Sequence, residues 1–173
     1  MTYAELISIA PFEWQAVGTS VLCGAIIGLE RQVRGKPVGI RTSALITLGT
    51  YIFIAASMLV STAATDPSRI IGQVITGIGF LGAGVMLARD GMVLGVTSAA
   101  TIWSLAAIGV CIALGYDVVA IKLSIVIVVV LVGVDTMEDY SQVLRRGVHK
   151  KYQDWFESPK GNEKQEMVDK KQE

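Results

Sequence analysis

Five apolar stretches dominate the pattern of hydrophobic and polar positions along this chain, and short polar links separate them. The stretches cover residues 14–29, 40–61, 70–88, 96–115 and 118–134. Each is close to the ~20 residues that a helix needs to cross a hydrocarbon core of ~30 Å. Backbone polar groups find no water inside lipid, and runs such as IVIVVVLV at residues 125–132 do not alternate as barrel strands do. The stretches are therefore predicted to be transmembrane helices.

Composition and charge support the same interpretation. Hydrophobic residues make up 52% of the chain and the mean hydropathy is +0.55, although the formal net charge is zero. The charged residues are concentrated in the links and in the C-terminal tail, a segregation that the core of a soluble protein does not require. The predicted fold class is an all-α integral membrane protein with a five-helix transmembrane domain over residues 1–134.

Lys and Arg residues gather on one side of the predicted membrane, which gives the chain an orientation. That side holds Arg31, Arg34, Lys36, Arg41, Arg89, Arg145, Arg146, Lys150 and Lys151, whereas the opposite side holds Arg69 and Lys122. By the positive-inside rule, the N-terminus lies outside and the tail lies in the cytoplasm. No positive charge precedes the first span and no small-residue cleavage site follows it, so this span is expected to be retained.

An internal repeat is suggested at an offset of 56 residues. Three glycines at the end of the first span and in the link after it match three others: Gly28, Gly35 and Gly39 correspond to Gly84, Gly91 and Gly95. If the repeat is real, helices one and two duplicate helices three and four about an axis along the membrane normal, which gives a 2+2+1 arrangement. The alternative is chance agreement in a chain with 18 glycines. Both interpretations stay open.

The third span is rich in glycine. Its GxGxxG run has the spacing of a dinucleotide-binding fingerprint, but that motif needs a preceding strand and a βαβ unit, which this context does not provide. Glycines inside a spanning helix instead let neighbouring helices approach closely. The residues expected to serve helix packing are Gly77, Gly79, Gly82 and Gly84 here, with Gly24 and Gly28 on the first span as a matching small surface. The alternative is a backbone break near Gly82 and Gly84 that exposes carbonyls.

Polar and ionisable residues near the membrane are candidates for function. The candidate polar cluster consists of Glu30, Arg31, Arg41, Thr42, Asp66, Arg69, Gln73, Thr97 and Thr101. Glu30 is expected to be ionised and to pair with Arg34 one turn later or with Arg41 across the link. The structural alternative is anchoring by side chains that snorkel to the interface. Asp66 before Pro67 also has the pattern of a helix N-cap followed by proline at the first helical position.

Five sequence blocks in order resemble the signature blocks of the MgtC/SapB family of bacterial inner-membrane proteins. They are GLERQ at 28–32, GIRT at 39–42, DPSRI at 66–70, GIGFLGAG at 77–84 and TSAATIW at 97–103. The resemblance covers about residues 14–134. It implies a five-helix domain in proteins tied to growth at low magnesium and to bacterial survival inside host cells. The family's best-known members modulate other membrane proteins, among them ATP synthase and transport systems for magnesium or potassium.

The chain departs from those members after the fifth span, where they carry a cytoplasmic α/β regulatory domain. Only about 39 residues follow the last span here, so functions of that domain are not carried over. Apolar positions recur every three or four residues over 135–156, which predicts a basic amphipathic helix on the cytoplasmic leaflet. Residues 157–173 are too polar to bury and are predicted to be disordered.

Two classes of function remain after these observations. The chain is either a modulator that binds other membrane proteins, or a second copy of itself, through helix packing in the bilayer, or an ion or small-solute transporter. A transport path would be lined by Glu30, Arg41, Gln73, Thr76 and Thr101. The modulator is favoured because magnesium prefers carboxylate and water ligands and no carboxylate lies deep in a span. The residue pattern suggests no enzyme, metal, cofactor or nucleic-acid site.

Overall fold

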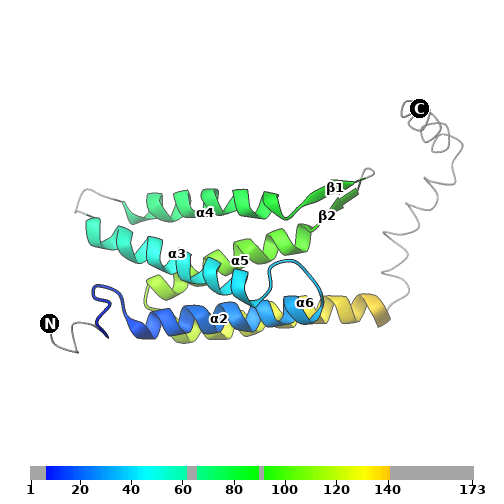
Figure 1. Cartoon of the computed structure of the whole chain (residues 1–173), viewed down its shortest axis with the longest axis horizontal. Helices are drawn as coiled ribbons and strands as arrows, with labels where there is room; N and C mark the ends of the chain where they lie inside the picture. Colours follow the sequence, from blue (N-terminus) through cyan, green and yellow to red (C-terminus); the bar gives the residue numbers. More distant parts are fainter. Residues whose placement is uncertain (1–6, 62–65, 90–91, 141–173) are drawn as a thin grey trace, which may run out of the picture. The chain divides into compact units, whose positions relative to one another are not determined.

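Five helices lie where the five apolar stretches predict helices. The computed structural model describes residues 7–61, 66–89 and 92–140. Its helices are α2 (Trp14–Val33), α3 (Ile40–Val60), α4 (Pro67–Gly84), α5 (Val96–Ala113) and α6 (Asp117–Tyr140), and its strands are β1 (Leu87–Arg89) and β2 (Met92–Leu94). Figure 1 shows the order of these elements along the chain.

Across the described residues the fold is all-helical, as predicted, apart from a short β-hairpin between α4 and α5. Strands β1 and β2 pair antiparallel, with Leu87 opposite Leu94 and Arg89 opposite Met92. The third helix therefore ends at Gly84 and not at Ala88, because the chain beyond its cap at Val85 pairs with β2. The helix is continuous as far as Gly84, so the predicted backbone break does not interrupt it. The turn expected at Asp90 and Gly91 lies outside the described residues.

The chain divides into two compact units, residues 1–129 and residues 130–173. The described part of the second unit is residues 130–140, the C-terminal turns of α6. This helix runs past Val134 to Tyr140 without the boundary that the sequence predicts at residue 135. The remainder of the predicted amphipathic helix and the whole of the predicted disordered tail lie outside the described residues.

Direct contact between backbones joins α2 to α3. A Cβ added at Gly24 would lie 2.5 Å from the Cα of Ala44, and one added at Gly28 would lie 2.6 Å from the Cα of Ile40. Only glycine fits at such distances, and close approach increases the dispersion energy that holds helices together in lipid. Gly24 and Gly28 of the first span therefore do lie at a helix contact, but the helix that they contact is α3 and not the third span.

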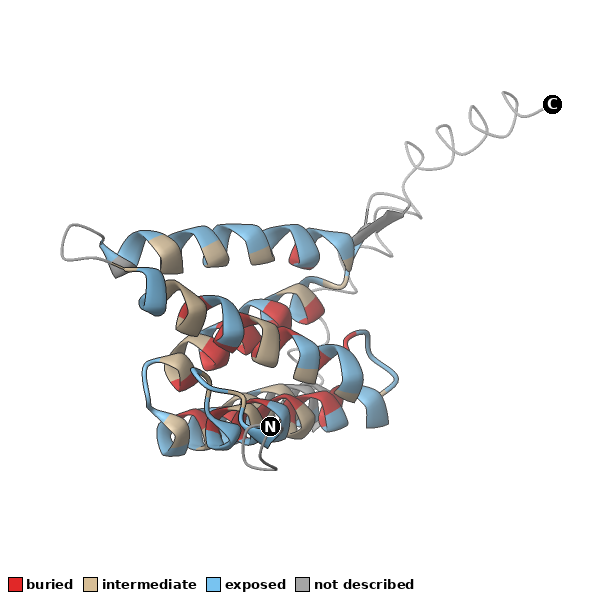
Figure 2. Ribbon diagram, turned by 60° about the vertical axis from the view of Figure 1, so that its left-hand side comes forward, coloured by how far each residue is buried: buried red, intermediate tan, exposed pale blue. Residues whose placement is uncertain are grey.

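Helix α5 lies at the centre of the first unit. Its side chains Ile102, Leu105, Ile108 and Ile112 are at most 2% exposed. A Cβ at Gly109 would lie 2.6 Å from the Thr47 carbonyl oxygen of α3, so these two helices also meet through their backbones. In Figure 2 the buried residues, drawn in red, gather on α3 and α5 and on α2.

Helix α4 is at the periphery of the unit, although the sequence predicts that its glycines serve helix packing. It packs on α3 and α5, but Gly82, which contacts Ala99 of α5, is its only buried residue among those described. A Cβ added at Gly77, Gly79 or Gly84 would meet nothing within 4 Å. Gly84 and its suggested repeat partner Gly28 thus have different surroundings, so these two glycines do not share one structural role.

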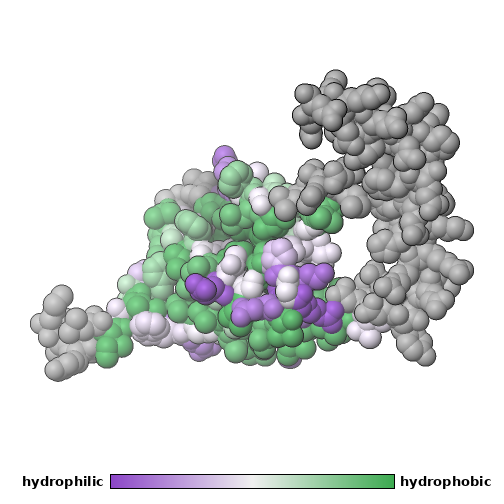
Figure 3. Space-filling model, turned by 45° about the vertical axis from the view of Figure 1, so that its right-hand side comes forward, coloured by the Kyte–Doolittle hydropathy of each residue, from purple (hydrophilic) through white to green (hydrophobic). Residues whose placement is uncertain are grey.

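The distribution of polarity is that of a membrane protein. Large apolar side chains face outward, with Phe80 80% exposed, Val33 78% and Phe53 68%, and apolar exposure on this scale does not suit a soluble monomer. The face shown in the space-filling view is largely hydrophobic, with one main group of hydrophilic side chains and a few separate ones elsewhere (Figure 3). Helices α3 and α5 are long and apolar enough to cross a bilayer. The five-span topology stays a prediction.

The backbone contact between α2 and α3 can be tested with alanine substitutions. Gly24→Ala should destabilise the fold by about 1–3 kcal/mol, the usual cost of forcing an extra methyl into a packed interface. Gly79→Ala is the matched control, since its new methyl meets open space and alanine favours a helix by about 0.5–1 kcal/mol over glycine. Thermal unfolding in detergent measures both changes. Equal stability of Gly24→Ala and wild type would contradict the described approach of the two helices.

Candidate functional site

A buried group of charges closes the C-terminal end of α2. The Glu30 side chain is 6% exposed, Arg31 is 3% exposed and Arg34 is 30% exposed. The Glu30 carboxylate lies 3.0 Å from Arg34 Nε and 3.6 Å from Arg31 Nη1. The structure therefore contains the first of the two predicted pairings, Glu30 with Arg34, and adds Arg31 to it. We call these three residues the charge cluster.

The contacts within the charge cluster are ionic. Arg34 Nε is close enough to Glu30 Oε1 for an ion pair, but neither carboxylate oxygen of Glu30 has a hydrogen bond among the described residues, and Arg31 Nε has none either. A buried charge is costly unless an opposite charge compensates it. Glu30 and Arg31 compensate each other in the interior, whereas the more exposed Arg34 adds an attraction that water screens in part.

The link between α2 and α3 holds the charge cluster in place. Its backbone turns at Gly35, with φ of 63°, and Lys36 N–H donates to the Arg31 carbonyl at 2.9 Å. Val38 is buried with φ of 69°, a left-handed conformation that costs a β-branched residue on the order of 1–3 kcal/mol. The Ser43 hydroxyl donates to the Val38 carbonyl at 3.1 Å and helps to fix this conformation.

Arg41 and Thr42, in the first turn of α3, are exposed. Within the described part of the chain Arg41 forms no ion pair, so the alternative pairing of Glu30 with Arg41 is not found. The orientation of the α3 start explains this, because Gly28 and Ser43 lie at the contact of the two helices. Arg41 is left on the outer surface, and Gln32 in the last turn of α2 and Lys36 in the link are exposed as well.

Asp66 has the structural role that its sequence context allows. Its carboxylate accepts a hydrogen bond from Ser68 N–H at 2.9 Å, and Pro67 occupies the first position of α4. The side chain and then the backbone of Ser68 donate to the carboxylate, and these bonds lower the pKa of Asp66 below its ordinary value. Asp66 is the N-cap of α4.

Arg69 and Gln73 project from the exposed side of α4. Together with Gly72, Thr76 and Gly77 they line a surface hollow of about 570 Å³, which we call the polar hollow. The Thr76 hydroxyl bonds the Gly72 carbonyl of its own helix at 2.8 Å. Within the described residues, the Arg69 and Gln73 side chains have neither an ion pair nor a hydrogen bond. The polar hollow thus offers one cation and one amide to the surroundings.

The two threonines of α5 differ in burial. Thr97 is exposed, whereas Thr101 is 2% exposed and donates to the Thr97 carbonyl at 2.8 Å. The residues proposed to line a transport path therefore lie in separate places. Glu30 lies near the C-terminal end of α2, and Gln73 and Thr76 face outward from α4. The Thr101 hydroxyl forms its hydrogen bond within α5.

Buried hydroxyl side chains form a polar interior that sequence reasoning missed. The additional residues are Ser20, Ser43, Thr47, Thr50, Ser98 and Ser124, each at most 3% exposed. Several bond the carbonyl four residues earlier, as Ser20 does to Ala16 at 2.7 Å and Ser124 to Ala120 at 2.9 Å. The signal available in the sequence was their small size within apolar runs, which suits close helix packing.

Comparison with known proteins places the chain in a family. The model of the MgtC family matches residues 17–140. The chain belongs to the MgtC family. YhiD of Escherichia coli K12, which its name describes as a candidate magnesium transporter, is 39% identical to it over 150 residues, covering 83% of this chain and 66% of YhiD. No solved structure matches the chain.

Two further relatives show how much of the family this chain represents. MgtC of Salmonella typhimurium is 47% identical over 109 residues, covering 62% of this chain and 46% of MgtC. An uncharacterized protein of Haemophilus influenzae is 37% identical over 143 residues, covering 78% of this chain and 57% of that protein. The MgtC-family chain described here thus spans from about half to about two thirds of the length of these relatives.

The role of the charge cluster can be tested by paired substitutions. Glu30→Ala should cost roughly 3 kcal/mol of stability, because it leaves the buried Arg31 charge uncompensated. Glu30→Ala combined with Arg31→Met should recover much of that loss, since no buried charge then remains. Combination with Arg41→Ala should be additive to within about 0.5 kcal/mol, because the two side chains form no pair. Thermal unfolding of the single and double variants gives both coupling energies, and strong coupling to Arg41 would contradict the described geometry.

The cap at Asp66 predicts a dependence of stability on pH. Folding lowers the pKa of Asp66, so its stabilising contribution is present above the pKa of the unfolded chain and is lost as the pH falls through the lower pKa of the folded protein. Asp66→Asn keeps a capping oxygen without this titration. The difference in unfolding free energy between wild type and Asp66→Asn should therefore be constant near pH 7 and should change as the pH falls below about 4, where an ordinary aspartate begins to take up its proton. If the two proteins differed in unfolding free energy by the same amount at every pH, the titration of Asp66 would not contribute to stability.

Proposed function

We propose that this MgtC-family chain is a magnesium-linked protein of the bacterial inner membrane that modulates other membrane proteins by helix packing. Its N-terminus would face outward and its C-terminus the cytoplasm. The magnesium link rests on the names of its relatives, in particular that of YhiD. The observation that supports modulation over transport is the scattering of the path residues, which lie at the end of α2, on the outside of α4 and within α5.

The exposed helix α4 supports the same proposal. At four of its five glycines an added Cβ would meet nothing within 4 Å, and the residues beside them include the outward-facing Phe80. In a bilayer such a surface suits contact with another helix, because small residues permit close approach and dispersion then replaces contacts with lipid. The partner would be another membrane protein or a second copy of this chain.

The second candidate function is transport of magnesium or another small solute. The name of YhiD favours it, and so does the presence of a buried carboxylate, Glu30, at the edge of a membrane helix. Against it, Glu30 already lies within ion-pair distance of two arginines, and magnesium would have to displace them to gain this ligand.

Reconstituted flux separates the two functions. Liposomes that contain the purified chain and an internal magnesium indicator should show no more magnesium entry than liposomes without protein. Flux that depends on the chain and falls in Glu30→Gln would establish transport and refute the modulator.

The modulator makes a positive prediction of its own. A photo-crosslinking residue at the exposed position Phe80 should give a defined adduct with one membrane protein in cells grown at low magnesium, whereas the same residue at the buried position Ala106 should give none. Gly79→Leu should remove both the adduct and the support of growth at low magnesium while the unfolding temperature in detergent stays unchanged. Full growth of Gly79→Leu would remove α4 from the proposed interface.

A further inference from the structure

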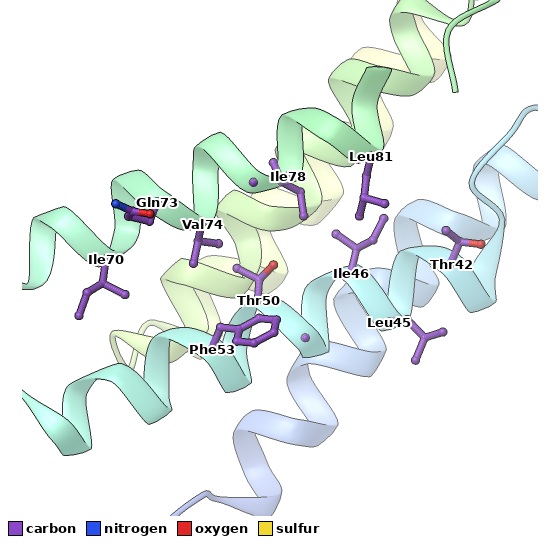
Figure 4. A pocket seen from close by; sticks show the side chains of 12 residues that line it. Thr42, Leu45, Ile46, Thr50, Phe53, Ile70, Gln73, Val74, Ile78 and Leu81 are labelled. Carbon is purple, nitrogen blue, oxygen red and sulfur yellow. The ribbon is translucent and has the colours of Figure 1, made fainter. Parts of the chain in front are cut away.

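An apolar groove lies between α3 and α4. Its volume is about 700 Å³, within the range of ligand-binding clefts. Figure 4 shows Val74, Ile78 and Leu81 of α4 pointing toward α3, with Ile46 and Thr50 opposite them. All of these residues belong to the first unit of the chain. The walls are therefore mainly apolar, with Phe53 as the one aromatic residue of the lining, and they enclose open space between the two helices.

Two glycines form the middle of the groove. Gly49 of α3 and Gly77 of α4 both line it, and a Cβ added at either would meet nothing within 4 Å. The missing side chains on both walls give the groove its depth at this level. A side chain larger than alanine at either position would occupy the space directly, and the open surroundings show that it would do so without a backbone clash.

The length of the groove matches one leaflet of a bilayer. Its lining extends over 42–53 of α3 and 70–81 of α4, eleven residue steps on each helix. At 1.5 Å per step this is roughly 16 Å, close to half of a hydrocarbon core of ~30 Å. A single extended acyl chain crosses the same distance.

The polar hollow adjoins the groove toward the start of α4. Gln73 and Gly77 line both spaces, and Arg69 stands in the turn that precedes them. Arg69 is exposed and forms no ion pair with any described residue, so its charge is available to a ligand at the end of the apolar groove. The complementary ligand is an amphiphile that has an anionic head and an apolar tail.

We propose that the α3–α4 groove and the polar hollow together bind an anionic phospholipid. One acyl chain lies in the groove along Val74, Ile78 and Leu81. The phosphate pairs with the Arg69 guanidinium, a partner suited to phosphate because its N–H groups form a planar fork. The amide of Gln73 donates to an ester oxygen of the glycerol backbone. A free phosphate ion has no apolar part to fill the groove, and a neutral chain alone leaves Arg69 uncompensated.

Native mass spectrometry of the full-length chain in detergent tests this site. The chain is stripped of lipid and titrated with dioleoyl phosphatidylglycerol or with dioleoyl phosphatidylcholine. One phosphatidylglycerol should be retained in preference to phosphatidylcholine. Arg69→Gln should reduce that preference about tenfold, the scale of one charge-assisted hydrogen bond. Gly77→Leu should abolish retention of both lipids, because the new side chain fills the groove.

Two matched variants separate the site from general effects. Gly79→Leu adds the same side chain to α4 outside the groove, and Lys122→Gln removes an exposed cation from α6. Both should retain phosphatidylglycerol as the wild type does, and inorganic phosphate should not displace it. Unfolding temperatures show whether each variant is folded. If Gly77→Leu fails to fold, Gly49→Ile fills the groove independently from the α3 side.

Three results would overturn the proposal. Undiminished lipid retention in folded Gly77→Leu and Gly49→Ile would show that the groove is not the site. An equal loss of the headgroup preference in Arg69→Gln and Lys122→Gln would show a general charge effect. A wild-type dimer that becomes a monomer in Gly77→Leu would show that a helix of a second copy occupies the groove. None of these results depends on whether the chain modulates or transports, so the lipid site and the proposed function fail independently.

Discussion

Direct backbone contact between helices is the interaction on which the rest of this structure depends. Water does not drive helices together inside lipid, so packing and interhelical contacts have to do so. Gly24, Gly28 and Gly109 bring α2, α3 and α5 so close that no side chain fits between them. The apolar side chains that a soluble protein would bury can then lie on the outer surface, as Phe80 does.

This close packing also explains the polar interior. Ser20, Thr47 and Ser124 are small enough to sit in the contacts and satisfy their hydroxyls on the carbonyls of their own helices. The charge cluster solves the same problem for ionised groups, since Glu30 and Arg31 are buried side by side and compensate each other. The interior therefore contains small hydroxyl side chains among its apolar ones; the hydroxyls named here are hydrogen-bonded within their own helices, and the Glu30 and Arg31 charges compensate each other as an ion pair.

Helix α4 stands apart from this arrangement and carries the surfaces that can meet other molecules. Its glycines Gly77 and Gly79 are not used for packing within the chain, and Arg69 and Gln73 find no partner among the described residues. One side of α4 faces the groove against α3, and the open glycines leave a further surface free. A lipid and a partner protein could therefore use different parts of one helix, which makes α4 the element that connects the domain to its surroundings.

The sequence by itself determined where the helices lie, because a run of about 20 apolar residues has few other solutions in a bilayer. It also determined local features that depend on neighbours along the chain: the cap of α4 by Asp66 and the pairing of Glu30 with Arg34 one turn later. The family followed from five short blocks at their spacing.

Only the tertiary structure decided which glycines pack and which stay open. Glycine permits close approach at Gly24 and Gly79 alike, but the partner of each depends on how α2 to α5 are placed in space, which no local pattern records. The sequence did not predict the hairpin after Gly84 for a similar reason. Apolar residues such as Leu87 and Leu94 suit a membrane helix and a strand equally well, and only the pairing of β1 with β2 distinguishes the two. Interactions between sequence neighbours, such as a helix cap, can be predicted from the sequence. Which of several similar glycine surfaces packs against another helix depends on contacts between segments distant in sequence.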